Sequence, residues 1–367
     1  MLEDLLRHLV ALVAFDTRNP PRAIDPDGIF TYLLNTLVGF DCTLADHGAG
    51  SVSLLAVRGR PRLLFNVHLD TVPDSPQWTS DPLKLVVGEE RAVGLGACDI
   101  KGAAAALLVA AQRTNGDCAL LFTSDEESND ARGVPAFLRA NPAGRSMFQA
   151  VIVAEPTRCE AVLAHRGISS LLLRFGGSAG HASAPQVASS SAVHQALRWG
   201  ARALDWVDAR AHERFAGLTG LRFNVGRIEG GIKGNVIAPA CEVRCGFRAL
   251  PSMDSDAVLA VLRTLAQPVP EHFEEIFRGP PLPSGGVAEA EARRLAARDL
   301  ADGLGLPVGN AVDFWTEAAL FSAAGYTSFV FGPGDIAQAH AADEWVALDQ
   351  LRRYADLVFR VIDGGHA

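Results

Sequence analysis

The sequence predicts an α/β protein with a mostly parallel sheet that carries helices on both faces. Short apolar runs alternate along the chain with segments of helical periodicity, which is the pattern of consecutive βαβ units. The runs are continuous and bounded by turn-forming residues, as is typical of strands that are buried on both faces. The clearest runs cover residues 63–67, 119–123, 150–154 and 328–331.

The predicted elements follow in order from the N-terminus. Leu2, Leu5, Leu9 and Val13 recur at helical spacing and predict an amphipathic first helix. An Ala-rich run over 103–111 follows a Gly-flanked turn and predicts a helix with small side chains. Further helices are expected over 27–37, 288–300 and 348–362, with an additional strand over 53–57.

The pattern changes near residue 167, where a second unit is expected. Its elements have the order βαββαβ, which is the order of a split βαβ fold. Apolar and charged residues alternate over 242–250, so one face of its sheet is predicted to be buried. We therefore expect an inserted α+β domain over 167–278 and a catalytic domain made of 1–166 and 279–367. The expected strands are 168–175, 221–228, 242–250 and 275–277, and the expected helices are 188–206 and 254–265.

The composition is that of a globular protein without a membrane span. Hydrophobic residues make up 49% of the chain and charged residues 20%, and the formal net charge is −9. A negative net charge argues against nucleic acid as a partner, because phosphate binding needs a basic face. No apolar stretch is long enough to cross a bilayer, and no signal peptide is expected. The six cysteines lack zinc-finger spacing, so we expect reduced thiols and a cytoplasmic location.

Residues of the types that bind metals follow the predicted strands. His68 and Glu155 end two of the apolar runs, residues 125–127 (Asp-Glu-Glu) follow a third, and His340 comes after the fourth. Asp99 lies in the Gly-flanked turn before the Ala-rich helix. Open α/β sheets bind ligands at the carboxyl ends of their strands, so these side chains are expected to meet at one edge.

Each of these residues also has an ordinary structural explanation when it is taken alone. Asp99 would serve as the N-cap of the following helix. Residues 125–127 would form a solvated acidic turn. Glu155 would simply follow the end of a strand, and His340 would be a surface histidine. A metal site is the better interpretation because all of them except Asp99 follow strand ends, where they would meet together with Asp99.

Two histidines and at least three carboxylates exceed the three protein ligands that one catalytic zinc needs. The economical arrangement is a pair of cations that share Asp99, whose turn lies in the middle of the set. Such paired cations lower the pKa of a water and polarise a carbonyl. The side chains would then be divided between the two cations as follows: His68 and Glu155 at one, Glu127 and His340 at the other.

Two further carboxylates would support this centre. Asp70 follows His68 by two residues and is placed to hold the second ring nitrogen of that histidine. Glu126 is left over beside the ligand Glu127. A carboxylate that binds no cation but lies beside the reacting water is what a general base requires.

Several motifs of the chain resemble those of the dinuclear aminoacylases and exopeptidases, a family that includes acetylornithine deacetylase, succinyl-diaminopimelate desuccinylase and glutamate carboxypeptidase. The resemblance extends over nearly the whole chain. Residues 315–318 and 332–340 are most similar to the acetylornithine deacetylase branch, and more narrowly to its variant that hydrolyses N-acetyl-L-citrulline in arginine biosynthesis. The motifs that carry the family resemblance are 68–73, 96–102, 125–128, 155–157 and 180–183.

The resemblance implies roles that spacing alone does not give. It implies that Asp99 bridges two divalent cations, zinc or cobalt, that Glu126 is the base, and that the Asp99–Ile100 peptide bond is cis. The inserted domain would be a dimerisation or lid domain, so a homodimer is expected. His181 would stabilise the oxyanion in the partner subunit's site. The residues implied to contact the substrate are Asn235, Arg248 and Thr316.

One departure from the family pattern concerns Asn235. Ala238 stands before Pro239, where the family usually has its proline one residue closer to the asparagine. The resemblance therefore does not fix the reach of Asn235 toward a substrate.

The leading hypothesis is a metal-dependent amidohydrolase that removes the acetyl group from an N-acetyl amino acid of arginine biosynthesis, either N-acetyl-L-citrulline or N-acetyl-L-ornithine. A second hypothesis is a dipeptidase or aminoacylase of broader specificity. A third is a catalytically silent metal-binding relative, which would have no need for the base Glu126.

Overall fold

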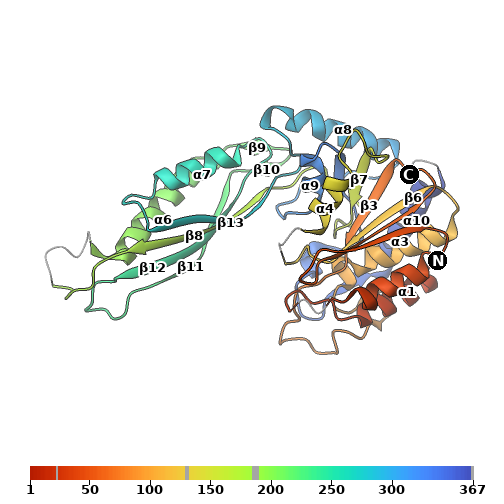
Figure 1. The fold of residues 1–367 in the computed structure, drawn as a ribbon, viewed down its shortest axis with the longest axis horizontal. Coiled ribbons are helices and arrows are strands. Elements are labelled where there is room, and N and C mark those ends of the chain that lie inside the picture. Colours follow the sequence, from red (N-terminus) through yellow and green to blue (C-terminus); the bar gives the residue numbers. More distant parts are fainter. Residues whose placement is uncertain (22–23, 129–131, 184–189, 365–367) are drawn as a thin grey trace. The chain divides into compact units, whose positions relative to one another are not determined.

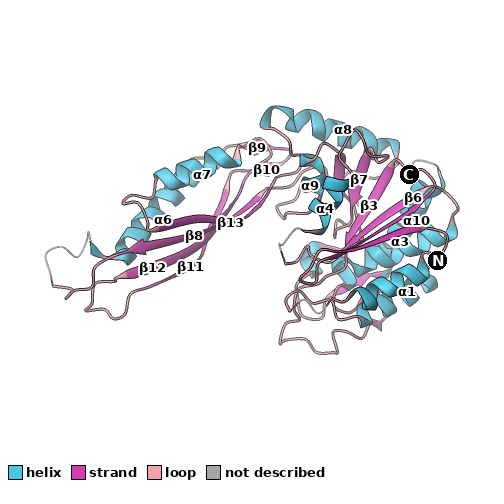
Figure 2. Cartoon of the chain, viewed as in Figure 1, coloured by secondary structure: helices cyan, strands magenta, loops and turns pink. Residues whose placement is uncertain are grey.

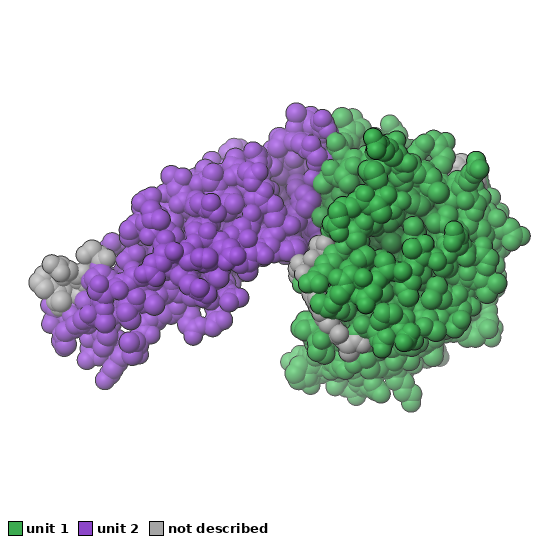
Figure 3. All heavy atoms as spheres, in the orientation of Figure 1, with its two compact units in different colours: residues 1–163, 292–309, 316–367 green, residues 164–291, 310–315 purple. Residues whose placement is uncertain are grey.

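The computed structural model describes residues 1–21, 24–128, 132–183 and 190–364, which form two compact units (Figure 3). The first unit comprises Met1–Leu163, Ala292–Gly309 and Thr316–Ala367, and the second comprises Ala164–Glu291 and Asn310–Trp315. The expected inserted domain, 167–278, lies within the second unit.

The first unit is built on a six-stranded sheet of order β1-β2-β6-β3-β7-β14 (Figure 1). The neighbours β6, β3, β7 and β14 are parallel, whereas β1 and β2 run antiparallel at one edge. The prediction of a mostly parallel sheet is therefore confirmed. The strands are β1 Asp41–Asp46, β2 Val52–Arg58, β3 Leu63–His68, β6 Cys118–Thr123, β7 Ala150–Val153 and β14 Thr327–Val330.

Helices cover both faces of this sheet. α1 (Leu2–Ala14), α3 (Gly102–Arg113) and α10 (Leu348–Asp363) pack together on one face, and α4 (Gly133–Ala140) and α9 (Ala318–Ala323) lie on the other (Figure 1). The small side chains of α3 allow this close packing, because its residues from Gly102 to Ala111 are all buried. The layered α/β architecture thus follows from the apolar pattern of the sequence.

The expected helix over 27–37 is interrupted. A helical segment over Pro26–Phe30 directly precedes α2 (Thr31–Thr36), and within that segment Gly28 adopts φ −86° and ψ −108°, which is not helical. The remaining elements of the first unit are α8 Ala290–Gly303, whose first two residues are assigned to the second unit, and a three-stranded sheet of β4 Val86–Val87, β5 Arg91–Val93 and β15 Trp345–Ala347.

The second unit contains a four-stranded antiparallel sheet of order β11-β12-β8-β13 (Figure 2). This is the strand order of a split βαβ fold, with α6 and α7 packed on one face. Val243, Cys245 and Phe247 are buried on that face, as their alternation predicts. The elements are β8 Ile168–Gly176, α6 Ala192–Asp208, β9 Arg214–Phe215, β10 Leu218–Thr219, β11 Arg222–Gly230, β12 Ala240–Arg248, α7 Ser255–Thr264 and β13 His272–Gly279.

The start of α6 has a clear cause. Ser191 is its N-cap and accepts a hydrogen bond from the backbone N–H of His194. The expected helix began at residue 188, but residues 188 and 189 lie outside the described residues. Among the described residues, no helix has the length and apolar character needed to span a membrane.

Candidate metal centre

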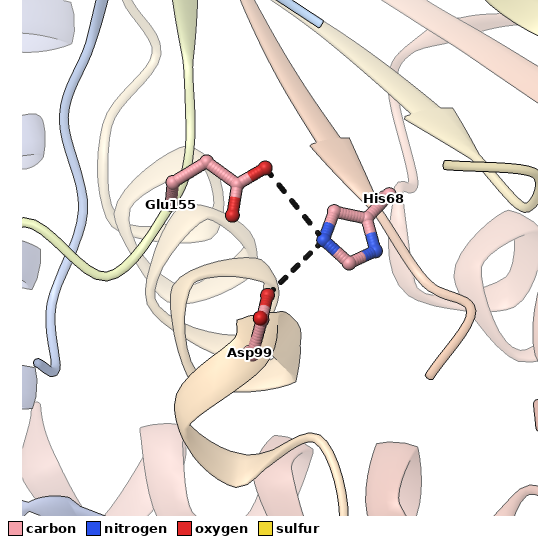
Figure 4. A group of neighbouring side chains, drawn as sticks. All are labelled: His68, Asp99 and Glu155. Carbon is pink, nitrogen blue, oxygen red and sulfur yellow. Dashed lines mark hydrogen bonds and ion pairs between the residues drawn. The ribbon is translucent and has the colours of Figure 1, made fainter. Parts of the chain in front are cut away.

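The first cluster of the site forms where the parallel strands end. β3 ends at His68, and Glu155 follows the neighbouring strand β7. His68 Nε2 lies 3.2 Å from Asp99 Oδ1 and 3.8 Å from Glu155 Oε1. Figure 4 shows that the same ring nitrogen faces both carboxylates. All three side chains are buried, so a nitrogen and two oxygens converge on one enclosed point.

The second cluster uses the other oxygen of the same aspartate. His340 Nε2 lies 2.9 Å from Glu127 Oε1 and 3.4 Å from Asp99 Oδ2. In each cluster the three ligand atoms lie within 4.8 Å of one another. Because Asp99 directs Oδ1 toward one histidine and Oδ2 toward the other, the donor set fits two cations that share this carboxylate. Nitrogen and oxygen donors of this kind suit zinc and cobalt.

Asp99 is held in an irregular turn, Ala97–Lys101, that leads into α3. The turn begins at Gly96, whose φ is +76° and whose added Cβ would lie 2.6 Å from Thr71 Cγ2, so only glycine fits there. The Asp99–Ile100 peptide bond is cis, as the resemblance implies. The turn therefore presents the Asp99 carboxylate from a buried and well-defined backbone.

Asp70 connects His68 to the turn after β6. Its carboxylate accepts the backbone N–H of Glu126 at 3.3 Å and that of Glu127 at 2.9 Å. The side-chain amide of Asn19 donates a further bond at 3.0 Å. His68 Nδ1 is 3.0 Å from the Asp70 carbonyl oxygen and 3.4 Å from Asp70 Oδ1. Asp70 thus orients the backbone of two site residues as well as one histidine.

The charges of the site strongly influence one another. Burial and the charge of Asp99 raise the pKa of Glu155 to about 7. Hydrogen bonds to Asp99 and Glu127 raise the pKa of His340 to about 10. Burial opposes a charge on His68, but hydrogen bonds to Asp70, Asp99 and Glu155 raise its pKa overall. Several buried carboxylates so close together are costly unless positive charge lies between them.

Glu126 differs from its neighbours. Its side chain is half-buried, and among the described residues no hydrogen bond or ion pair holds it. Burial, followed by the charge of Glu127, raises its pKa well above the usual value for a glutamate. A carboxylate with these properties remains available to accept a proton.

The remaining predicted site residues are divided between the two units. His181, Asn235 and Arg248 belong to the second unit, whereas Thr316 belongs to the first and is fully buried. Two of them are neighbours, because the backbone N–H of Ala182 bonds to the Asn235 carbonyl at 3.1 Å. His181 and Asn235 are both exposed there.

The structure adds contacts for three residues to which the sequence assigned no role in the site. Asn19 is buried and bonds to Asp70, as described above. Glu317 is buried, and Thr123 donates a hydrogen bond to its Oε2 at 3.3 Å, so it does not line an open substrate pocket. Glu344 accepts bonds from the Asp99 turn. Glu317 belongs to the motif 315–318, whereas no motif marked Asn19 or Glu344, although Glu344 follows His340 by only four residues.

Comparison with known proteins places this site in a family. The model of Peptidase family M20/M25/M40 matches residues 64–364. The chain belongs to this family. It is 63% identical to N-acetyl-L-citrulline deacetylase of Xanthomonas campestris, over 100% of this chain and 99% of that protein. It is 32% identical to acetylornithine deacetylase of Myxococcus xanthus, over 87% of this chain and 85% of that protein.

Solved structures agree with the fold of the M20/M25/M40 family. An M20 family metallo-carboxypeptidase of Sulfolobus solfataricus matches with a TM-score of 0.76 at 17% identity, covering 98% of each chain. The aminopeptidase PepT of Bacillus cereus matches with a TM-score of 0.74 at 18% identity, covering 100% of this chain and 99% of that one. At such identities the likeness concerns the architecture.

Proposed function

We propose that this protein is a metal-dependent amidohydrolase that removes the acetyl group from N-acetyl-L-citrulline, or from N-acetyl-L-ornithine, in arginine biosynthesis. The observation that carries the proposal is the Asp99 carboxylate, which directs one oxygen to His68 and the other to His340. The 63% identity to N-acetyl-L-citrulline deacetylase over the whole chain supports the choice of substrate.

Two divalent cations, zinc or cobalt, would be held by the clusters on either side of Asp99. Bound there, they lower the pKa of a water and polarise the amide carbonyl. The first would take His68 and Glu155, and the second Glu127 and His340. The nitrogen and oxygen donors and their burial support this assignment.

Glu126 acts as the general base in this proposal. It takes a proton from the attacking water while the water oxygen bonds to the acetyl carbon. The same carboxyl then passes a proton to the amide nitrogen, the C–N bond breaks, and acetate and a free amine leave. The absence of a hydrogen bond to the Glu126 side chain among the described residues supports this role.

His181 donates a hydrogen bond to the carbonyl oxygen as negative charge develops on it. Its ring Nδ1 lies 2.8 Å from Ser183 Oγ, which leaves Nε2 for the substrate. In the homodimer that we propose, this histidine serves the site of the partner subunit. Asn235 lies beside it and would contact the same substrate.

Arg248 would bind the substrate carboxylate. It is half-buried, and its guanidinium makes no hydrogen bond or ion pair with the described residues. Burial and the charge of Arg166 lower its pKa, so an anion nearby would stabilise it. It lines a cavity of about 390 Å³ with Arg222 and Asn224. Thr316 is retained as a further candidate contact.

The second unit offers a surface for dimerisation. Leu197 and Leu204 lie two turns apart on α6 and are 56% and 47% exposed. Ile228 on the edge strand β11 is 46% exposed. An apolar helix stripe beside an unpaired strand edge is a typical place for a second copy to bind. We propose a cytoplasmic homodimer formed through this unit.

Initial rates on N-acetyl-L-citrulline, N-acetyl-L-ornithine and a panel of dipeptides, each with zinc or cobalt added, test the proposed activity. The expected result is deacetylation of one acetylated amino acid with little cleavage of dipeptides. Faster cleavage of dipeptides would favour a broader peptidase, and the lack of turnover with either metal would favour a silent relative.

Mixing two inactive variants tests the proposed dimer. Glu126→Gln and His181→Ala are each expected to be nearly inactive. After subunit exchange, a mixed dimer has one site with both groups intact and regains up to half of the native activity per dimer. If no activity returns despite demonstrated exchange, His181 does not act in the partner's site.

A further inference from the structure

Glu344 is buried directly behind the turn that carries Asp99. Its Oε2 accepts the backbone N–H of Gly96 at 3.0 Å. Its Oε1 accepts the N–H groups of Cys98 at 2.8 Å and of Asp99 at 2.9 Å. The side chain is only 2% exposed, so water does not compete for these bonds. One carboxylate therefore binds three backbone donors of a single turn.

The turn needs such a partner. Asp99 has φ −121° and ψ 87°, and Ile100 has φ −144° and ψ 26°, so regular helical hydrogen bonding is broken here. Ala97 and Cys98 are fully buried, and Asp99 is 6% exposed. Without Glu344, three buried N–H groups would lose their acceptor, and an unpaired buried donor is costly.

Glu344 also belongs to the segment that carries His340. Its own carbonyl accepts the N–H of Gly94 at 3.0 Å, and β15 begins directly after it and pairs with β5. Asp343, in the same segment, bonds to a different part of the protein. Its carboxylate accepts hydrogen bonds from Thr79 N–H at 2.9 Å and from Thr79 Oγ1 at 2.8 Å. Glu344 therefore joins the backbone of the shared carboxylate to the backbone of one histidine.

We propose that Glu344 is a positioning residue that sets the direction of the Asp99 carboxylate, so that one oxygen faces each histidine. This inference rests on the two-cation centre of the proposed function. An ionised carboxylate suits the task because it offers only acceptors, and its bonds to N–H groups are strengthened by its charge. A glutamine at this position would direct its NH₂ group against at least one backbone N–H.

The test compares Zn²⁺ binding by the full-length protein and by Glu344→Gln, starting from metal-free samples and using a chromophoric chelator as competitor. If Glu344 acts through the shared Asp99, both zinc affinities fall, each by about 10–100-fold. Far-UV circular dichroism of the metal-free protein stays unchanged. Glu344→Asp keeps the negative charge on a shorter side chain. Its zinc affinities should therefore lie between those of the native protein and those of Glu344→Gln.

Asp343→Ala is the matched control, because it loosens the same segment without touching the Asp99 turn. Its zinc affinities should stay within a few-fold of the native values. Loss of only one zinc in Glu344→Gln would show that Glu344 acts through the His340 segment alone, and the proposal would be wrong. Unchanged affinities in both Glu344 variants would also overturn it. A native protein that binds fewer than two zinc ions would instead refute the two-cation centre.

Discussion

Glu126 and Glu127 are adjacent in the sequence but have different surroundings. Glu127 Oε1 lies 2.9 Å from His340 Nε2, whereas no described residue bonds to the Glu126 side chain. Both backbone N–H groups are fixed by Asp70. The proposed division into a ligand and a base is therefore a matter of side-chain direction within one turn.

This difference predicts opposite effects of two isosteric changes. Glu126→Gln should keep both cations and lower kcat by about 100-fold to 10,000-fold, because the base is lost. Glu127→Gln should lose one cation, because a ligand is lost. Metal analysis of the two purified variants beside their rates checks the assignment. If cation is lost from Glu126→Gln, the residue is a ligand.

Asp70 should matter for stability as well as for metal binding. Asp70→Ala removes the acceptor of two backbone N–H groups and of the Asn19 amide. We expect the free energy of unfolding to fall by about 3 kcal/mol, since each buried donor left unpaired costs about 1–3 kcal/mol. Zinc affinity should fall by about 10–100-fold. Denaturant unfolding and a zinc titration measure the two effects.

Thr114→Val is a suitable control for Asp70→Ala. The Thr114 hydroxyl bonds to Asp363 at 3.0 Å and accepts the Gly116 N–H at 3.0 Å, away from both clusters. This variant should be less stable while keeping its zinc affinity. If Asp70→Ala behaves in the same way, Asp70 has no part in metal binding.

At the level of elements, the segments that follow β7 and β14 pack closely against each other beside the site. A Cβ on Gly332 would lie 2.4 Å from the backbone oxygen of Glu155 and 2.9 Å from its nitrogen. The close approach of these two segments places Glu155 next to Asp99 and His68. Glycine is therefore required at position 332, two residues beyond the end of β14.

Gly332→Ala should displace Glu155 and weaken zinc binding, with a loss of about 1–3 kcal/mol in stability from the forced contact. Gly303→Ala is the matched control. Gly303 ends α8, and nothing lies within 4 Å of its added Cβ, so alanine should be neutral or stabilise by up to about 1 kcal/mol. Equal zinc affinities in the two variants would contradict this view of the two segments.

The elements also show how far the sequence alone could lead. The strands could be predicted because apolar runs mark them, and parallel order then placed His68, Glu155 and residues 125–127 at one edge. Glu344 could not be predicted, because it lies 245 positions from Asp99 along the chain and binds its backbone. The break at Gly28 was missed because apolar periodicity continues across it.

At the level of the whole molecule, the buried charges predict a stability that depends on pH and on metal. Burial first, and then the charge of Asp99, raise the pKa of Glu155 and of Glu344 to about 7. The folded protein without metal therefore binds more protons than the unfolded chain, and its stability falls as the pH rises from about 4.5 through 7. The raised pKa of His340 acts in the same direction.

Cations reverse this dependence, because they bind the deprotonated ligands and so bind more tightly as the pH rises. The difference in Tm between zinc-loaded and metal-free protein should grow by several degrees from about pH 5 to about pH 8. Thermal unfolding of both forms in matched buffers measures it. A difference that stays constant or narrows would show that the clustered carboxylates are not neutralised by the metal.

The residues of the two clusters are made at different moments of translation. His68, Asp99 and Glu155 all precede the second unit, whereas His340 follows it and lies 213 positions beyond its partner Glu127. The ligands of the first cluster are therefore made before the second unit, but Glu344, which accepts three N–H groups of the Asp99 turn, is made only near the end of the chain. The edge of β7 likewise remains open until β14 emerges. The C-terminal part of the chain thus completes both clusters, because it supplies His340 to one of them and the acceptor of the Asp99 turn to both.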